Sequence, residues 1–353
     1  MNNLRLPPPR GSPSGLRLRS THSSDHSPAS NSKESKDRIV QQTDQDASQS
    51  RVSAVETGYL HDDFAKAFCA QEGARKFPLI NRGTFVRTTA LDRLVNTFLS
   101  ASPNQRKQII CFGAGSDTRY FRLRQSLPPD ALKNLVYHEI DFAAVTTSKV
   151  AAILRNQFLP SADIKAVDEA AGYLVADGYY IHPLDLRSLQ PGCQMITGVE
   201  PDTPTLFISE CCLIYLSPEE ADAIVRWSTG DFTGSVGMVI YEPIGGEDAF
   251  GKVMIQNLAS RGIVLKTLKK YSTLERQRLR FKALGFVDGQ QAADVYFISE
   301  EWIGESEKER IARLEMLDEV EEWRLLARHY CVAWAWRGEE FAVWKGAVPL
   351  QTE

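Results

Sequence analysis

Two glycines at the end of a short apolar run are the first residues in this chain that could take part in chemistry. The run 109–112 ends in Gly113, Ala114 and Gly115, a pattern typical of a buried strand, a tight turn and a helix start. Because glycine has no Cβ, a ligand can lie directly on this turn. Thr118 stands where a dinucleotide fingerprint has its third glycine. The spacing favours a ligand with a ribose and an amino-acid tail but no phosphates, which describes S-adenosylmethionine; an ordinary strand-to-helix turn is the alternative.

Acidic residues near the ends of two other apolar runs are candidates for ligand contacts. The run 135–141 ends in Asp141, and Glu139 lies on the same face of the expected strand. In doubly wound folds a carboxylate about 20 residues after the glycines binds the ribose hydroxyls, so one of these two is expected to do so. Glu210 lies within the most apolar run, 205–216. A carboxylate there is costly to bury unless it is paired, so Glu210 is a site candidate or half of a core ion pair.

Two loops add further candidates. Asp185 and Leu186 follow an expected strand over 178–182, where the acid could accept from the adenine amine while the leucine packs on the ring. A helix N-cap is the equal alternative for Asp185. Arg87 is the last residue of an apolar-flanked loop, 77–87, that is expected to lead into a helix. Its guanidinium can form a bidentate pair with a carboxylate, although an arginine in such a loop is more often solvated or structural.

Composition limits the function classes. The chain has 353 residues, of which 43% are hydrophobic and 24% charged, enough to bury one large core or two small ones. The net charge of −4 and the lack of a basic tract argue against nucleic-acid binding. The six cysteines are scattered without a C-x-x-C pair, which indicates thiols in a reducing compartment and no metal site. No apolar run has the length of a membrane span.

The first 50 residues differ in composition from the rest. They are rich in Ser, Pro, Asn, Gln and Asp, so we predict a disordered tail over 1–50 and a methyltransferase domain over 51–353. Arginines precede the first acid, Asp25, as in a transit peptide, but Pro7–Pro9 would break an amphipathic helix there.

Alternating elements define the expected fold. Helices are expected before the sheet over 52–99, in an insertion over 246–300 and over 307–329. The five expected parallel strands and a terminal hairpin are 109–112, 135–141, 178–182, 205–216, 236–242 and 330–344. The pattern predicts an α/β, class I S-adenosylmethionine-dependent methyltransferase with a Rossmann-like seven-stranded sheet and an antiparallel terminal hairpin strand. The class, rather than the periodicity, gives the spatial order 3-2-1-4-5-7-6.

Seven short motifs extend the match from class to family. They lie at 58–63, 80–87, 113–118, 139–142, 185–187, 209–216 and 328–335. In this order the chain resembles the leucine carboxyl methyltransferases over about residues 51–345. That family methylates the C-terminal leucine α-carboxylate of the type 2A protein phosphatase catalytic subunit. The resemblance implies a cytoplasmic enzyme, expected to be a monomer, that uses S-adenosylmethionine, acts on this phosphatase subunit, and binds no nucleic acid, membrane or metal.

The resemblance also assigns residues. It implies cofactor contacts at Arg51, Arg87, Gly113, Gly115, Asp141, Asp185, Leu186 and Glu210. Arg51 stands where the family has a lysine, a change that keeps the charge but not the geometry. A sister group modifies wybutosine-type tRNA and carries a β-propeller after the catalytic half; no propeller follows here, which favours the protein substrate. A non-catalytic phosphatase-binding protein is the other alternative.

The reaction sets modest demands on the site. A C-terminal carboxylate, with a pKa of about 3.5, is already ionised at pH 7, so no general base is needed. Arg87 and Tyr215 are the candidates to hold this carboxylate, Tyr215 because it follows the buried Glu210 at the carboxyl end of its strand. Arg87 could instead bind the carboxylate of the cofactor. The arginines at 276, 278 and 280 are expected to form a solvated face or to contact the phosphatase.

Overall fold

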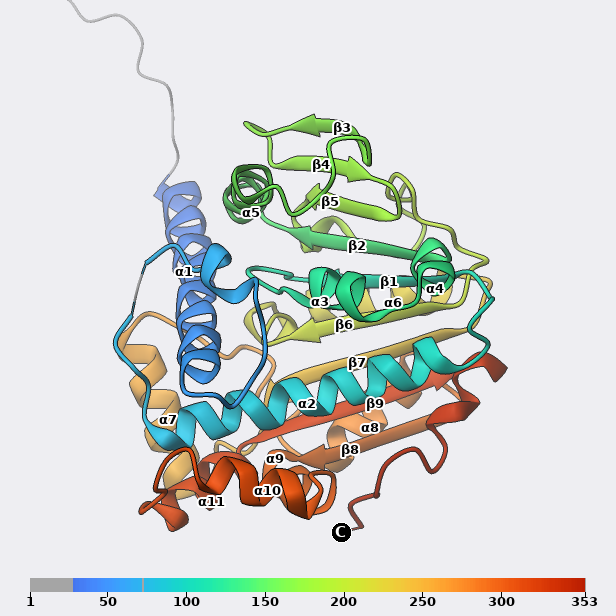
Figure 1. The fold of residues 1–353 in the computed structure, drawn as a ribbon. Helices are drawn as coiled ribbons and strands as arrows, with labels where there is room; N and C mark the ends of the chain where they lie inside the picture. The colour runs from blue at the N-terminus through green and yellow to red at the C-terminus, as the bar shows by residue number, and fades with distance from the viewer. Residues whose placement is uncertain (1–27, 72, 353) are drawn as a thin grey trace, which may run out of the picture.

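A twisted sheet of nine strands forms the centre of the molecule (Figure 1). The computed structural model describes residues 28–71 and 73–352. The strands lie side by side in the order β3-β4-β5-β2-β1-β6-β7-β9-β8. Their bounds are β1 (Lys107–Phe112), β2 (Leu135–Asp141), β3 (Ile164–Asp168), β4 (Tyr173–Ala176), β5 (Tyr179–Pro183), β6 (Thr205–Glu210), β7 (Val236–Pro243), β8 (Gly289–Asp294) and β9 (Tyr330–Arg337). Counted from β5, this is the expected order 3-2-1-4-5-7-6, with β9 antiparallel to both neighbours.

Helices cover the sheet on both faces and at its carboxyl edge. Their bounds are α1 (Pro28–Glu56), α2 (Pro78–Ser100), α3 (Arg119–Ser126), α4 (Pro129–Lys133), α5 (Ala143–Asn156), α6 (Pro218–Gly230), α7 (Ala249–Ser260), α8 (Leu274–Ala283), α9 (Val295–Glu301), α10 (Glu305–Ala312) and α11 (Val320–Arg328). Short 3-10 turns are η1 (Ala65–Phe68), η2 (Leu186–Ser188), η3 (Leu213–Tyr215) and η4 (Glu339–Trp344). Within the described part of the chain, none of the helices is long and apolar enough to cross a membrane.

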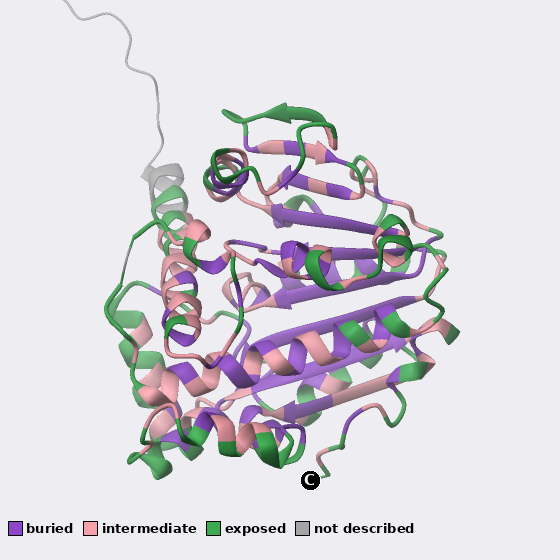
Figure 2. Cartoon of the chain, viewed as in Figure 1, coloured by how far each residue is buried: buried purple, intermediate pink, exposed green. Residues whose placement is uncertain are grey.

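The central parallel strands are buried on both faces, as Figure 2 shows in purple. Successive side chains therefore enter two different cores. Ile109 of β1 belongs to one apolar cluster together with Leu206 of β6, while Ile110 and Phe207 belong to the other. Strands buried in this way are apolar at nearly every position, which is why the sequence identified them.

The sheet differs from the prediction at three places. Two antiparallel strands, β3 and β4, extend it beyond β5, giving nine strands rather than seven. β6 ends at Glu210 rather than at 216, because Cys211 takes a left-handed backbone (φ 49°) and leads into η3. The expected terminal hairpin is wrong: β9 leads into η4, and its second partner is β8, whose sequence Gly-Gln-Gln-Ala-Ala-Asp has little strand propensity.

The predicted disordered tail is wrong for residues 28–50, where the structure has α1. The composition argument counted only apolar burial, whereas polar contacts hold this helix to the body of the protein. Asp37, for example, pairs with Arg187, and Asp44 accepts hydrogen bonds from Ser116. Residues 1–27 of the predicted tail lie outside the described residues.

The region expected to be a helical insertion, 246–300, also contains sheet structure. Within this region α7 and the segment after it lie at the carboxyl edge of the strands, while α8 packs against β8 and β9. The side chain of Arg280 on α8 is buried, with 3% of the residue exposed, and lies between Glu242 and Asp222. The expectation that Arg280 belongs to a solvated or partner-binding face is therefore wrong. The helix expected over 307–329 is divided into α10 and α11.

Candidate active site

A cavity of about 570 Å³ opens at the carboxyl edge of the sheet. Its walls come from the ends of β1, β2 and β6, from the loop after β5, and from α1, α2 and the segment after α7. In Figure 1 this is the left-hand side of the sheet, where α1 stands across the strand ends. The volume is that of a site for a ligand of nucleoside size. Open α/β sheets bind their ligands at this edge.

The glycine turn forms the floor of the cavity. Gly113 and Gly115 have φ values of +62° and +47°, which other residues rarely adopt. A Cβ at position 113 would lie 2.4 Å from Sγ of Cys212. The backbone amide of Gly115 donates to Oδ2 of Asp141 at 2.8 Å. Glycine is therefore needed at both positions for the turn to form and for a ligand to approach its backbone.

Asp141, rather than Glu139, reaches the cavity. Its Oδ1 also accepts from the amide of Phe142 at 2.7 Å, and burial raises its pKa to about 6. Glu139 is 1% exposed, pairs with Lys149 at 2.5 Å, and is not one of the described residues that line the cavity. Of the two carboxylates predicted to contact the ribose, only Asp141 is placed to do so.

Glu210 lies at the end of β6 between two guanidinium groups. Its Oε2 accepts from Nε of Arg87 and its Oε1 from Arg119, each at 2.7 Å. Burial alone would raise the pKa of Glu210, but these two cations hold it well below its ordinary range. Glu210 is thus half of an ion pair, as one of its two alternatives predicted; it also lines the cavity, and its contact with the cofactor stays a prediction. These two bonds fix the position of the Arg87 guanidinium, and the low pKa of Glu210 makes it a poor proton acceptor.

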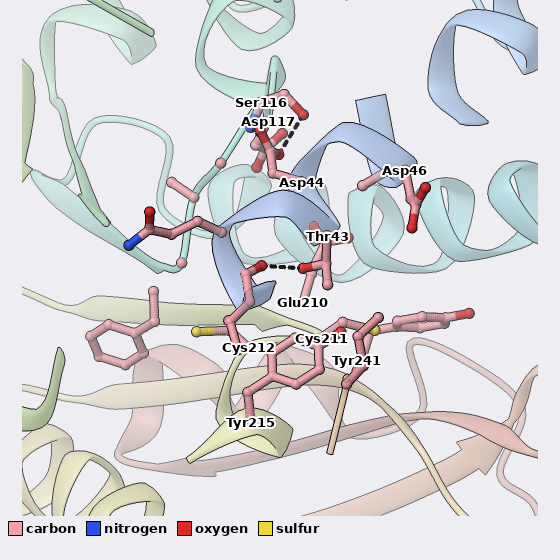
Figure 3. A pocket seen from close by; sticks show the side chains of 18 of the residues that line it. Thr43, Asp44, Asp46, Ser116, Asp117, Glu210, Cys211, Cys212, Tyr215 and Tyr241 are labelled. Carbon is pink, nitrogen blue, oxygen red and sulfur yellow. Dashed lines mark hydrogen bonds between the residues drawn. The ribbon is translucent and has the colours of Figure 1, made fainter. Parts of the chain in front are cut away.

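Arg87 and Tyr215, the two candidates to hold the acceptor carboxylate, both line the cavity. The loop expected over 77–87 is wrong, because Arg87 lies within α2. The guanidinium of Arg87 lies 4.6 Å from the ring centroid of Tyr241, and within the described chain no hydrogen bond is recorded from its terminal nitrogens. Tyr215 lies in η3, half-buried, near Thr43 of α1 in Figure 3. Burial raises the pKa of the Tyr215 phenol, so it stays protonated and can donate a hydrogen bond.

Asp185 and Leu186 line the cavity at the end of β5. Asp185 caps η2 by accepting from the amide of Arg187 at 3.0 Å, and it also accepts from the Arg187 side chain. The N-cap alternative is thus correct for Asp185, and its contact with an adenine stays a prediction. Leu186 supplies an apolar surface there.

Arg51 lines the cavity from the last turns of α1. Its Nη1 pairs with Oδ2 of Asp62 at 3.0 Å, and Asp62 is buried. Burial, together with the charge of Arg122, lowers the pKa of Arg51. The arginine that replaces the family lysine is therefore tied to a carboxylate of the chain, and its cofactor contact stays a prediction.

Sequence reasoning missed several residues of this site. Arg119 is fully buried behind Glu210, and Asp37, Thr43 and Asp44 line the cavity from α1. Arg119 follows the glycine turn directly, a position that could have signalled a contact near the ligand. The α1 residues carried no such signal, because they lie in the segment whose composition predicted disorder.

The residues present fit S-adenosylmethionine. The glycine turn permits close approach, the Asp141 carboxylate can accept from a diol, Arg87 can meet a carboxylate, and Leu186 is apolar. In the described part of the chain, no group of three His, Cys, Asp or Glu side chains could hold a metal ion. The strand order and this site define the class of protein, an S-adenosylmethionine-dependent methyltransferase.

Comparison with known proteins gives the family. The family model described as leucine carboxyl methyltransferase matches residues 39–229. "Leucine carboxyl methyltransferase 1" of Aspergillus fumigatus is 51% identical over 344 residues, covering 88% of this chain and 86% of that protein. The protein of the same name from Emericella nidulans is 48% identical and covers 88% of each chain. A homologue from Arabidopsis thaliana is 39% identical, covering 84% of this chain and 88% of the other. The chain belongs to the leucine carboxyl methyltransferase family.

Proposed function

We propose that this chain transfers a methyl group from S-adenosylmethionine to the α-carboxylate of the C-terminal leucine of the type 2A protein phosphatase catalytic subunit. It does so as a monomer in the cytoplasm. The family membership and the names of the relatives support carboxyl methylation of a leucine. All six cysteines are free thiols, which supports a reducing compartment.

One observation carries the choice of a carboxylate as acceptor: among the described residues around Arg87, the cavity offers cations, and the acids and thiol there are unsuited to act as a general base. Among the described residues that line it there is no histidine. Glu210 is held ionised by two arginines, and both oxygens of Asp141 accept backbone amides. Burial raises the pKa of the Cys211 thiol to about 11, so it is not a base at neutral pH. An alcohol or an amine must lose a proton on methylation, and these groups are poorly suited to remove it.

A carboxylate needs no base, since its pKa of about 3.5 leaves it ionised at pH 7. Bound S-adenosylmethionine supplies an electrophilic methyl group. The residues of the chain then have to orient the acceptor and exclude water. Holding reacting atoms in a near-attack arrangement can account for roughly 7–11 kcal/mol of rate enhancement. Arg87 is preorganised for this by Glu210, because its Nε is already bonded and its position is fixed.

The apolar part of the cavity suits a leucine side chain. Leu79 of α2, Leu258 of α7 and Leu326 of α11 line it together with Ile263. A leucine side chain fully buried there would contribute on the order of 1.5–3 kcal/mol. These apolar side chains and the Arg87 guanidinium together suit a residue that has an apolar side chain and a terminal carboxylate.

A methyl-transfer assay tests this proposal. Labelled S-adenosylmethionine is incubated with intact phosphatase catalytic subunit, with the same subunit lacking its last leucine, and with bulk tRNA. Label is expected on the intact subunit alone, and it should be released by mild alkali as an ester is. Label on tRNA would support the tRNA-modifying alternative. Cofactor binding without transfer to any of the three would support the non-catalytic alternative.

A further inference from the structure

The N-terminal half of α1 covers the cavity but contributes little to the core. Of its described side chains before Ser48, none is buried, whereas Ser53 and Ala54 beyond it are. This half is held by polar contacts to three separate walls of the cavity. Asp37 pairs with Arg187, Asp44 with Ser116, and Asp46 with Arg261. Segments with few buried apolar contacts open at a low cost in free energy. The position of this half-helix therefore depends on a few named polar groups.

Asp44 is the contact at the cofactor floor. Its Oδ1 accepts from the amide of Ser116 at 2.7 Å and from the Ser116 hydroxyl at 2.8 Å (Figure 3). The preceding amide, that of Gly115, donates to Oδ2 of Asp141 at 2.8 Å. Two successive amides of the glycine turn thus hold two carboxylates, one from β2 and one from α1. A Cβ at position 115 would lie 2.3 Å from Oδ1 of Asp44, so glycine is also required there for α1 to close.

The two carboxylates repel each other without a cation between them. No recorded hydrogen bond joins a cationic side chain to Asp44 or Asp141 among the residues that the structure describes. Lys149, a buried cation whose charge acts on Asp141, is committed to Glu139 and to the carbonyl of Asp117. A ribose offers what is missing, because its vicinal hydroxyls are two neighbouring donors. Hydrogen bonds to charged acceptors are the stronger kind.

We propose that Asp44 is a second ribose-binding residue. Asp141 accepts from one hydroxyl of the cofactor ribose and Asp44 from the other, so cofactor binding fastens the N-terminal half of α1 over the cavity. The cavity of about 570 Å³ remains with Asp44 in place, so this carboxylate borders the cofactor space rather than filling it. The inference deepens the cofactor half of the proposed site and does not depend on the acceptor.

A binding experiment with the full chain tests it. S-adenosylhomocysteine, which carries the same ribose and cannot donate a methyl group, is titrated calorimetrically into wild type, Asp44→Ala and Asp46→Ala. Asp46 is the matched control, because it anchors the same half-helix at Arg261. Asp44→Ala is expected to weaken binding roughly tenfold or more, and Asp46→Ala by no more than about threefold.

Ligands that lack one ribose hydroxyl distinguish a direct contact of Asp44 with the ribose from an indirect effect through the position of α1. The titrations are repeated with the 2′-deoxy and 3′-deoxy forms of the same ligand. If Asp44 accepts from one hydroxyl, the loss caused by Asp44→Ala should shrink to within about threefold for the ligand that lacks it. An equal loss with all three ligands would show that Asp44 acts only by closing α1. Tighter binding by Asp44→Ala would show that the carboxylate blocks the site. No change would also overturn the proposal.

A conservative variant protects the test against misfolding. Asp44→Asn keeps an oxygen that can accept from Ser116 but removes the charge, so it should fold as wild type does. Its affinity for S-adenosylhomocysteine is expected to fall roughly three- to tenfold, because neutral acceptors bind hydroxyls less strongly. Wild-type affinity in a folded Asp44→Asn would contradict a charged contact with the ribose.

Discussion

Nε of Arg87 donates to Oε2 of Glu210 at 2.7 Å across 123 positions of the sequence, joining α2 to the end of β6. The bond fixes one edge of the guanidinium and leaves the terminal nitrogens for a carboxylate. Because Arg119 holds the other oxygen of Glu210, the carboxylate cannot rotate away. The site is thereby preorganised for an anion before any ligand arrives.

Arg87→Lys tests that geometry. Lysine keeps the charge but loses the planar fork, so a carboxylate in the cavity should lose one or two charge-assisted hydrogen bonds. We expect kcat/KM to fall roughly 10- to 150-fold, which corresponds to about 1.5–3 kcal/mol. Steady-state kinetics with each substrate varied in turn measures it. A rise in KM for the phosphatase alone would place the acceptor carboxylate at Arg87, and a rise for S-adenosylmethionine alone would place the carboxylate of the cofactor there. Wild-type kinetics would remove Arg87 from the site.

Asp141→Ala should weaken cofactor binding roughly 10- to 150-fold, since the ribose loses a charged acceptor. Glu139→Gln is the matched control two residues earlier on the same strand. Burial raises the pKa of Glu139 to about 7, so a neutral side chain is tolerated there. Its cofactor affinity should stay within about twofold of wild type. Calorimetry with S-adenosylhomocysteine compares the two variants. A larger loss of affinity in Glu139→Gln than in Asp141→Ala would assign the ribose contact to Glu139.

The part of this site that sequence reasoning found is the part built from local pattern. A buried strand, Gly113 and a second strand ending in Asp141 are each marked by neighbouring residues, and β1 and β2 then bring them together. What it missed depends on contacts distant in sequence. The helix α1 is stabilised by partners such as Ser116, 72 positions from Asp44. Arg280 of α8 appeared solvated because its partner Glu242 lies on β7, 38 positions earlier in the sequence.

Cofactor affinity should depend on pH through Asp141. Burial raises its pKa to about 6, and the ionised form is the stronger acceptor for a ribose hydroxyl and for the two backbone amides. Affinity for S-adenosylhomocysteine should therefore fall as the pH drops through 6, by about tenfold at pH 5 relative to pH 8. The free energy of unfolding should change with pH in the opposite direction. Because the pKa of Asp141 is higher in the folded than in the unfolded chain, this residue favours folding at a pH below its unfolded pKa, and that contribution is lost as the pH rises through 6. Asp141→Asn should flatten the affinity profile, and a persistent profile would assign it to another group.

Docking of the phosphatase should involve α7 rather than α8. Arg280→Glu places a third acid beside Glu242 and Asp222 in a buried site, so it should cost about 3–5 kcal/mol of folding stability. Val253 on α7 is 55% exposed, and Val264, which follows α7 and lines the cavity, is 59% exposed. Val253→Asp is expected to raise KM for the intact phosphatase while leaving S-adenosylhomocysteine affinity unchanged.

A peptide from the phosphatase tail is the control for docking. A single carboxylate and a leucine offer few contacts before the entropy of association is subtracted, so the peptide should be a poorer substrate than the folded subunit. Val253→Asp should not change its kinetics. Equal efficiency of peptide and intact subunit would contradict a second contact surface.

The central claim is that the acceptor is a C-terminal leucine carboxylate. The most direct measurement locates the methyl group by fragmentation mass spectrometry after reaction with the phosphatase catalytic subunit, alongside a tail peptide whose terminal carboxylate is converted to an amide. We predict the methyl group on the terminal leucine carboxylate of the intact subunit and no methylation of the amidated peptide. A methyl group on a side-chain carboxylate, a hydroxyl or an amine, or methylation of the amidated peptide, would contradict the account.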